Sequence, residues 1–328
     1  MRLITLEEHY RSERANAEIG EAGNYFRAAN SAGERMAAER LANLSELGER
    51  RLADMDKAGI DMQVVSHTHP SPEILPAARA IPLCRIVNDE IAEAVARYPK
   101  RFAGFATLPV ADPPAAAAEL ERAVRVGFKG ALINGVTQGR FLDDPFFTPL
   151  LECAEALEAP IYLHPAPPPE PVWEAYFSGI ETGLARMLSI AGWGWHAELG
   201  LHIVRLIANG VFERHPKLQV IIGHMGEMIP FFLARVNAAV TPFANLPKPF
   251  ADYFHSNIHI TTSGVFTAPP FNLCLEVVGA DRILFSVDYP YSPNEAGRAF
   301  LDRLSLAPAD FDKVTHGNAE RLLKIAKA

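Results

Sequence analysis

Histidines and carboxylates stand directly after several apolar runs of this 328-residue chain. The clearest case is the run 218–223, which ends at His224 and is soon followed by Glu227. Such a run is typical of a buried strand, and a helical pattern resumes at Met228, so the unit is strand, short turn, helix. Loops that follow strands in this arrangement often carry the chemistry of α/β proteins. The sequence therefore predicts that His224 and Glu227 lie at a functional site.

Other strand ends carry side chains of the same two kinds. Glu7 and His9 are two residues apart in an extended run, so they share one face of a strand while Glu8 lies on the other. His164 and Asp288 end two later apolar runs. A set of carboxylates and imidazoles favours Zn²⁺, Mn²⁺, Fe²⁺ or Co²⁺ over Ca²⁺ or a thiolate site. A divalent metal ion is therefore expected.

Strand-like runs alternate with helical patterns along the whole chain. Eight such runs are recognised, at 2–7, 62–66, 103–108, 130–134, 160–164, 218–223, 258–262 and 283–287. Helical patterns occupy 44–58, 82–98, 114–126, 145–157, 196–212, 228–240 and 270–278, with a closing helix at 315–328 capped by Asn318. This alternation predicts an α/β fold of the (β/α)₈ or TIM-barrel type, as a single domain over residues 1–328.

In such a barrel the carboxyl ends of all strands face one mouth, so residues far apart in the sequence can meet there. The alternative fold is a doubly wound open sheet. It is disfavoured because no glycine-rich phosphate-binding motif follows the first strand.

Two segments fall outside the repeat and are predicted to be insertions near the mouth. Residues 10–43 are polar and rich in Ala, Glu and Arg, which predicts a long loop with helical pieces that could cover a pocket. The second insertion spans 165–195. Its proline-rich part, 165–171, predicts a stiff surface loop, and its aromatic-rich part, 172–195, suggests a pocket wall or a subunit interface.

The composition narrows the class of partner. A net charge of −8 provides no basic surface for nucleic acid or anionic lipid, so a small-molecule partner is favoured. No apolar run reaches membrane-spanning length, and the N-terminus is charged too early for a secretory signal, so a cytoplasmic location is expected. The three cysteines, Cys84, Cys153 and Cys274, are far apart and suit reduced thiols.

A single histidine at a strand end is more often a structural residue than a metal ligand. The structural interpretation is therefore favoured for His67 and His69, which follow the second strand in a polar, proline-containing loop. Four strand ends with ionisable groups are harder to explain by packing, because buried ionisable groups need partners. The role of Glu198 is left open, and His196 is not assigned.

Five motifs stand at or near the strand ends. They are Leu-Glu-Glu-His at 6–9, Tyr-Leu-His-Pro at 162–165, Gly-His-Met-Gly-Glu at 223–227, Ile-Thr-Thr-Ser-Gly at 260–264 and Phe-Ser-Val-Asp-Tyr-Pro at 285–290. Together these motifs resemble the amidohydrolase superfamily. Within it they are similar to the ACMSD-like, metal-dependent decarboxylase branch, which includes γ-resorcylate and 2,3-dihydroxybenzoate decarboxylases. The resemblance runs along nearly the whole chain. Hydrolytic members usually begin with His-x-His, whereas this chain has Glu7-x-His9 as in the aromatic acid decarboxylases.

The resemblance implies a metal-dependent, non-oxidative decarboxylase of a hydroxylated aromatic carboxylic acid. It implies one divalent ion, Zn or Mn, and a homodimer or homotetramer. The ring substituents accepted would depend on the two insertions and on residues such as Tyr289 and Phe266. The alternative is a metal-dependent hydrolase of a small lactone, amide or ester that uses the same site.

The resemblance also implies a role for each site residue. Asp288 would donate the proton to the ring carbon, with His224 and Glu227 beside it, and Arg235 would pair with a substrate carboxylate. The implied metal ligands are Glu7, His9, His164 and Asp288.

Overall fold

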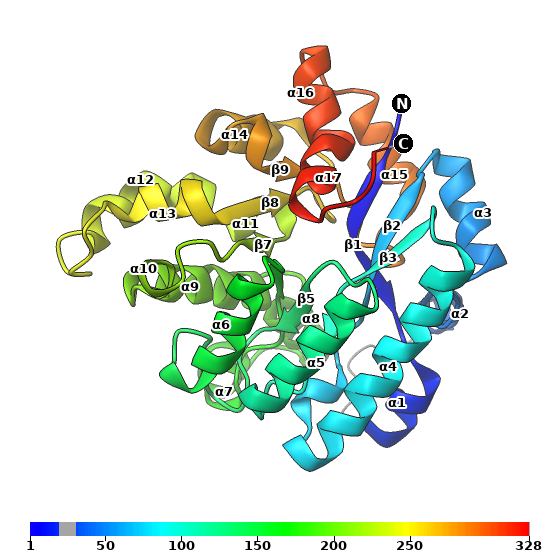
Figure 1. Cartoon of the computed structure of the whole chain (residues 1–328), viewed down its shortest axis with the longest axis horizontal. Coiled ribbons are helices and arrows are strands. Elements are labelled where there is room, and N and C mark those ends of the chain that lie inside the picture. The colour runs from blue at the N-terminus through cyan, green and yellow to red at the C-terminus, as the bar shows by residue number, and fades with distance from the viewer. Residues whose placement is uncertain (20–30, 328) are drawn as a thin grey trace.

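The chain folds into a barrel of parallel strands surrounded by helices (Figure 1). The structure is a computed structural model that describes residues 1–19 and 31–327. The strands in this part of the chain are β1 (Ile4–Tyr10), β2 (Met62–His67), β3 (Phe102–Gly104), β4 (Ala106–Thr107), β5 (Ala131–Asn134), β6 (Ile161–His164), β7 (Val220–Ile222), β8 (Ile258–Thr261) and β9 (Ile283–Leu284).

Every strand pairs in parallel with its neighbour in the chain, in the orders β1-β2-β3 and β4-β5-β6-β7-β8-β9. β3 and β4 are two parts of one predicted strand, interrupted at Phe105. The N–H group of Phe105 still donates to the carbonyl of Val65 in β2, at 2.9 Å. The eight predicted strands are therefore all present, and the third is divided.

The barrel closes between β1 and the segment that follows β9. The N–H group of His9 donates to the carbonyl of Tyr289 at 2.7 Å. The hydroxyl of Ser286 accepts hydrogen bonds from the N–H groups of Leu6 and Glu7, where the pairing of β1 with β2 shifts register. A side chain thus satisfies the backbone groups that this irregularity releases.

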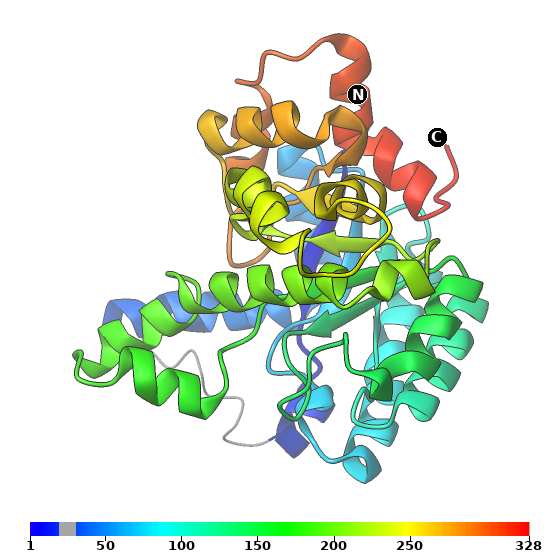
Figure 2. The same ribbon diagram turned by 90° about the vertical axis from the view of Figure 1, so that its left-hand side faces the viewer.

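Helices cover the outside of the barrel. They are α3 (Glu49–Ala58), α4 (Ala77–Arg97), α5 (Pro113–Arg125), α6 (Thr148–Ala156), α9 (Gly194–Ala208), α10 (Val211–Arg214), α12 (Ile229–Val240), α13 (Phe250–Asn257), α14 (Ala268–Val278), α15 (Asn294–Leu301), α16 (Pro308–Asp312) and α17 (Asn318–Leu322). The first insertion contains α1 (Glu13–Ile19) and α2 (Ser31–Leu44), and part of it lies outside the described residues. The second contains α7 (Glu170–Phe177) and α8 (Thr182–Ser189), which project from the barrel in Figure 2.

The core consists of two layers. Inside the barrel, Ile4, Phe105 and Ile221 pack together with Leu323, which follows α17. A larger apolar cluster lies between the strands and the outer helices. Because Ile4 begins β1, the closing segment plugs the N-terminal end of the barrel and leaves the carboxyl ends of the strands to the functional side chains. The chain termini lie close together at this end (Figure 1).

Two helices contain a proline at a position that differs from the prediction. α4 begins at Ala77, so Pro82 lies inside the helix rather than at its start. Pro171 lies in the first turn of α7, where its missing N–H group costs no helical hydrogen bond. The proline-rich segment 165–171 is therefore not a loop throughout.

Two other boundaries also differ. The helix predicted from residue 44 begins at Glu49, since Leu44 ends α2 and a turn separates the two helices. Asn318 does not cap the closing helix, because the preceding Gly317 is already helical. The Asn318 amide instead donates to the carbonyls of Ala280 and Ile283 at 2.7 and 2.8 Å, which ties α17 to β9.

Within the described part of the chain, no helix combines the length and the apolar character needed to cross a membrane.

Candidate metal centre

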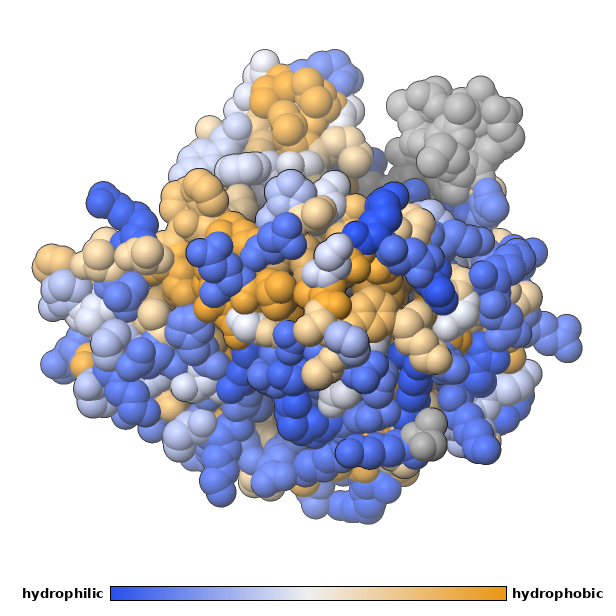
Figure 3. Space-filling model, turned by 90° about the horizontal axis from the view of Figure 1, so that it is seen from above, coloured by the Kyte–Doolittle hydropathy of each residue, from blue (hydrophilic) through white to orange (hydrophobic). Residues whose placement is uncertain are grey.

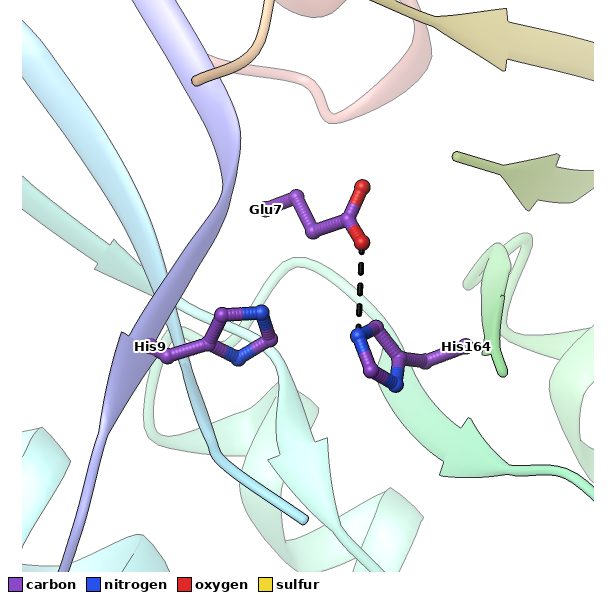
Figure 4. Close-up of side chains that lie close together, drawn as sticks. All are labelled: Glu7, His9 and His164. Carbon is purple, nitrogen blue, oxygen red and sulfur yellow. Dashed lines mark ion pairs between the residues drawn. The ribbon is translucent and has the colours of Figure 1, made fainter. Parts of the chain in front are cut away.

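The alternation of β1 places two predicted ligands on the same side of the strand. Glu7 and His9 are both fully buried and point towards His164, which is the last residue of β6 (Figure 4). The Nε2 atom of His164 lies 3.3 Å from Oε1 of Glu7. The rings of His9 and His164 meet edge to face, with their centroids 5.0 Å apart. The fold thus brings His164 close to side chains that precede it by 155 and 157 residues in the sequence.

One potential ligand atom from each of Glu7, His9 and His164 lies within 4.8 Å of the others. Ligands of a metal with bonds of about 2.1 Å are separated by roughly 3–4 Å, so the spacing suits a single ion. Oε1 of Glu7 and Nε2 of His9 are buried and have no hydrogen-bond partner among the described residues. Buried polar atoms without partners are costly, and a shared cation would satisfy both. The donor set therefore fits a divalent metal ion.

Burial lowers the pKa of His9 to about 4 and that of His164 to about 3. Both imidazoles are therefore neutral near pH 7 and keep a lone pair that a metal can bind. Burial alone would raise the pKa of Glu7, but the histidines around it outweigh burial and lower it, beginning with His224. Glu7 is therefore a carboxylate. Two neutral nitrogens and an anionic oxygen are suitable ligands for a divalent cation.

The second oxygen of Glu7 is held by neighbouring strands. Oε2 accepts hydrogen bonds from the hydroxyls of Tyr162 on β6 and Thr261 on β8. These contacts orient the carboxylate so that Oε1 faces the histidines. Gly223 provides the space, since a Cβ atom at that position would lie 2.7 Å from Oε2 of Glu7. The glycine at the end of β7 is thus required by the close approach of Glu7.

Asp288 lies directly beside this group of ligands, with its Oδ1 atom 3.1 Å from Nε2 of His9. Its backbone has a φ of 73°, which is unusual for a residue other than glycine. Glu8 stabilises this conformation, because its two carboxyl oxygens accept hydrogen bonds from the N–H groups of Val287 and Tyr289, each at 3.0 Å. Burial, and then the Glu7 carboxylate, raise the pKa of Asp288 well above its ordinary value.

His224 and Glu227 lie on a tight turn, α11 (His224–Glu227), that follows β7. The turn includes Gly226 with a φ of 82°, a conformation that glycine adopts without strain. Nδ1 of His224 lies 2.7 Å from Oε1 of Glu227. Nε2 of His224 lies 3.7 Å from Oε1 of Glu7 and 4.0 Å from Oδ2 of Asp288. His224 therefore connects Glu227 to the candidate metal ligands.

His196, which the sequence did not assign, is the third member of this group. Its Nδ1 atom lies 2.6 Å from Oε2 of Glu227, so the buried carboxylate is held between two imidazoles. Nε2 of His196 has two neighbours, the indole N–H of Trp195 at 3.0 Å and the carbonyl of Ala191 at 3.2 Å. The Trp195 N–H group can donate to Nε2 when the imidazole is neutral. The Ala191 carbonyl can accept from Nε2 when the imidazole is protonated. His196 therefore has a hydrogen-bond partner in either protonation state. The sequence signal for His196 was its position close to two tryptophans. Its contact with Glu227 could not be predicted, because the two residues are 31 positions apart.

The charges in this group are strongly coupled. Burial opposes the charged form of His224, but the carboxylates of Glu7 and Glu227 outweigh it and raise the pKa of His224 to about 10. Burial alone would raise the pKa of Glu227, yet His224 and a hydrogen bond from His196 lower it to about 2. At neutral pH the pair is therefore an imidazolium and a carboxylate.

Arg235 was predicted to bind substrate, a structural role was favoured for His67 and His69, and the role of Glu198 was left open. His67 and His69 are buried, and burial lowers their pKa values to about 3 and about 4. Glu198 is half-buried, which raises its pKa to about 7. Arg235 is exposed on α12 and has no hydrogen bond or ion pair to the ligand group in the part of the chain described.

Two aromatic residues expected to influence substrate choice point elsewhere. The hydroxyl of Tyr289 donates to Asp54 on α3 at 2.8 Å, and the ring of Phe266 packs on Phe300. Tyr291 instead faces the ligands, with its ring centroid 5.4 Å from that of His9. A tyrosine two residues further along is thus better placed to contact a bound molecule.

The stability of the protein should depend on pH through Glu73, which is buried in the loop after β2. Its Oε1 atom accepts from the backbone N–H of Asn134 at 3.0 Å and from the Asn134 side chain. Burial raises the pKa of Glu73 to about 8 from 4.5. The folded state therefore favours neutral Glu73, and the free energy of unfolding should fall by about 1.4 kcal/mol per pH unit between these two values.

Glu73→Gln should abolish this contribution, because glutamine does not ionise. The free energy of unfolding in urea is compared between the variant and the unsubstituted protein at each pH. The difference should move in favour of the variant by about 2–3 kcal/mol from pH 5.5 to pH 7.5. An equal difference in stability at the two pH values would contradict the prediction.

Comparison with known proteins places the chain in a family. The Amidohydrolase family model matches residues 34–325. The decarboxylase orsB of Emericella nidulans is 38% identical over 333 residues, which cover 98% of this chain and 97% of that protein. The γ-resorcylate decarboxylase of Rhizobium sp. (strain MTP-10005) is 38% identical over 296 residues, covering 86% and 88%. The chain belongs to the amidohydrolase family, and its fold is a (β/α)₈ barrel.

A solved relative has a bound metal. The dihydroxybenzoic acid decarboxylase of Polaromonas sp. JS666, determined with manganese and the inhibitor 2-nitroresorcinol, superimposes with a TM-score of 0.91 at 34% identity. The match covers 100% of this chain and 98% of that one.

Proposed function

We propose that this protein is a metal-dependent, non-oxidative decarboxylase of a hydroxylated aromatic carboxylic acid. The observation that carries the proposal is the convergence of Glu7, His9 and His164 beside Asp288, where two buried ligand atoms, Oε1 of Glu7 and Nε2 of His9, have no hydrogen-bond partner among the described residues. Relatives that match nearly the whole chain and are named decarboxylases support the reaction class. The ligands are Glu7, His9, His164 and Asp288, and the ion is manganese, as in the Polaromonas relative, or zinc.

The bound ion would act as a Lewis acid for the carboxylate and the adjacent phenol oxygen of the substrate. The chain's own residues handle the proton. Loss of CO₂ breaks a carbon–carbon bond whose electron pair stays on the ring carbon, and that carbon must gain one proton. We assign the proton donor role to Asp288; burial favours its protonated form and the bound cation opposes it, so the proton must reach Asp288 from the neighbouring residues. Each turnover therefore consumes one proton, which Asp288 must recover.

His224 and Glu227 lead from Asp288 towards the surface. Glu227 is fully buried, whereas the side chain of His196 is 20% exposed. His196, Glu227 and His224 are joined by contacts of 2.6 and 2.7 Å, and Nε2 of His224 lies 4.0 Å from Oδ2 of Asp288, which is beyond hydrogen-bond distance. Because His196 has a partner in either protonation state, it is suited to pass protons from solvent to this series. We assign to it the outer position of the proton route.

The homodimer or homotetramer expected from the sequence remains part of the proposal. The second insertion exposes apolar side chains, including Leu184, Met187 and Trp193, and Figure 3 shows a broad apolar area on the face seen from above. Exposed apolar areas of this kind often mark contacts with another chain. The role of Arg235 at a substrate carboxylate, the single-domain organisation and the cytoplasmic location also stay predictions.

The decisive experiment is incubation of the metal-loaded protein with a series of hydroxybenzoic acids. We expect equal amounts of CO₂ and the corresponding phenol, loss of turnover after chelation, and recovery when Mn²⁺ or Zn²⁺ is added back. A hydroxybenzoic acid without a hydroxyl beside the carboxylate should react far more slowly, because it cannot offer two oxygens to the ion. Cleavage of lactones or esters without any decarboxylation would instead establish the hydrolase alternative.

A further inference from the structure

A second group of polar side chains lines a pocket at the other end of the barrel from the metal centre. This basal pocket has a volume of about 580 Å³, and its wall is formed by residues that precede β6, β7 and β9, by His259 of β8 and by the closing segment. Gln219, His259 and Arg282 stand at or next to the N-terminal ends of β7, β8 and β9. His164 is the last residue of β6, and Asp288 lies in the segment that follows the carboxyl end of β9. The basal pocket is therefore separate from the candidate metal centre.

Arg282 is half-buried in the wall of this pocket without a carboxylate partner. Its guanidinium donates to Oε1 of Gln219 at 3.1 Å and to Nε2 of His259 at 3.0 Å, and both acceptors are neutral. The nearest acidic residue in sequence, Asp281, directs its carboxylate to Lys313 at 3.2 Å. No ion pair to Arg282 occurs in the described part of the chain. A partly desolvated guanidinium without a counter-ion is an unusual arrangement.

The charge around Arg282 is positive. Four cations and two carboxylates line the basal pocket, and they are Lys217, Arg282, Arg321, Lys324, Glu158 and Asp281. Glu158 pairs with Lys324 at 2.6 Å, and Asp281 pairs at 3.2 Å with Lys313, which lies outside the lining. The other three cations of the lining have no ion pair among the described residues, although the whole chain carries a net charge of −8. An anion would be attracted to this place and repelled from much of the remaining surface.

His259 lies beside Arg282 in the pocket wall. It is 3% exposed, and burial together with Arg282 lowers its pKa to about 3, so the ring is neutral. Its Nε2 atom lies 3.0 Å from the Arg282 guanidinium and 3.2 Å from Oε1 of Gln219. Neither neighbour therefore supplies a negative charge to offset that of Arg282.

The rest of the wall is apolar. It is formed by Ala154, Ala159, Pro160, Leu218 and Leu322. A volume of this size exceeds what an inorganic ion needs and falls within the usual range for small-molecule sites. Guanidinium groups bind carboxylate and phosphate oxygens in a two-pronged manner.

We propose that the basal pocket binds a small organic anion, with its carboxylate or phosphate head at Arg282 and Arg321 and its apolar body against Pro160 and Leu322. The site does not take part in decarboxylation, so the proposal can be tested independently of the proposed function.

Phenyl phosphate, titrated calorimetrically into the metal-loaded protein at 0.15 M salt, tests the site. We expect saturable binding to the unsubstituted protein. Lys217→Gln combined with Arg321→Gln should weaken binding at least tenfold, since both residues are exposed and can be replaced without disturbing the core. Arg282→Lys keeps the charge but loses the planar fork, and should weaken binding as well.

The matched control is Lys100→Gln combined with Arg303→Gln, which removes the same charge from exposed positions outside the pocket. It should bind phenyl phosphate like the unsubstituted protein. Equal binding by all variants would locate the anion elsewhere, including the metal centre, and would overturn the proposal. Equal weakening in both double variants would indicate non-specific attraction and would also overturn the proposal. The absence of saturable binding would overturn it as well.

Discussion

Replacing Asp288 with asparagine is expected to lower kcat for decarboxylation by about 10³-fold or more, since general acid catalysis contributes in that range. Asparagine keeps the shape of the side chain but cannot deliver a proton to the ring carbon. Asp288 is 3.1 Å from His9 and 4.0 Å from His224, so it lies between the proposed ligands and the proposed proton route. The measurement is phenol formation under saturating substrate, together with metal content per chain.

A metal titration separates the two roles of Asp288. If the loss of turnover arose only from weaker metal binding, saturating Mn²⁺ would restore the rate of the Asp288→Asn variant. We expect no restoration, because the proton donor is missing. Asp54→Asn is the matched control, as Asp54 binds the hydroxyl of the adjacent Tyr289 without touching the ligand group. A variant of Asp288 with a normal rate would remove the proposed mechanism.

Replacing His224 with asparagine should lower kcat by about 10²- to 10⁴-fold while leaving the bound metal almost unchanged. Nε2 of His224 lies 3.7 Å from Oε1 of Glu7, but a protonated imidazole has no lone pair for the ion, so His224 is proposed as an electrostatic neighbour rather than a ligand. Its positive charge is maintained by Glu7 and Glu227, which raise the pKa of His224 to about 10. Without the imidazolium, no residue of the proposed proton route lies between Asp288 and Glu227.

Comparison with His196 distinguishes a proton route from simple packing. His196→Gln should reduce kcat by less, about tenfold, because water can replace an outer proton carrier more easily than an inner one. Added imidazole should restore part of that rate, and the solvent deuterium isotope effect should increase. His215→Gln is the control, since His215 pairs with Glu155 outside the group. Loss of metal from His224→Asn, with full recovery in excess Mn²⁺, would show that His224 is a ligand instead.

The strand ends illustrate what can be predicted from sequence. The two-residue period of a strand places Glu7 and His9 on one face and Glu8 on the other, and this holds in the structure because the alternation is a local property of the backbone. The barrel could be predicted too, since strand and helix patterns are also local. Boundaries were predicted less well where side chains from distant elements decide them, as at Asn318, whose amide binds carbonyls 35 and 38 residues away.

The barrel, the order of its elements and the candidate ligands at the strand ends could be predicted from the sequence, because they follow from periodicity and residue type. The other side chains that join them became visible only in the folded chain. His196 contacts Glu227, Tyr289 binds Asp54, and Arg282 has no acidic partner among the described residues. These contacts depend on the relative positions of separate strands and helices, and no local pattern encodes those positions.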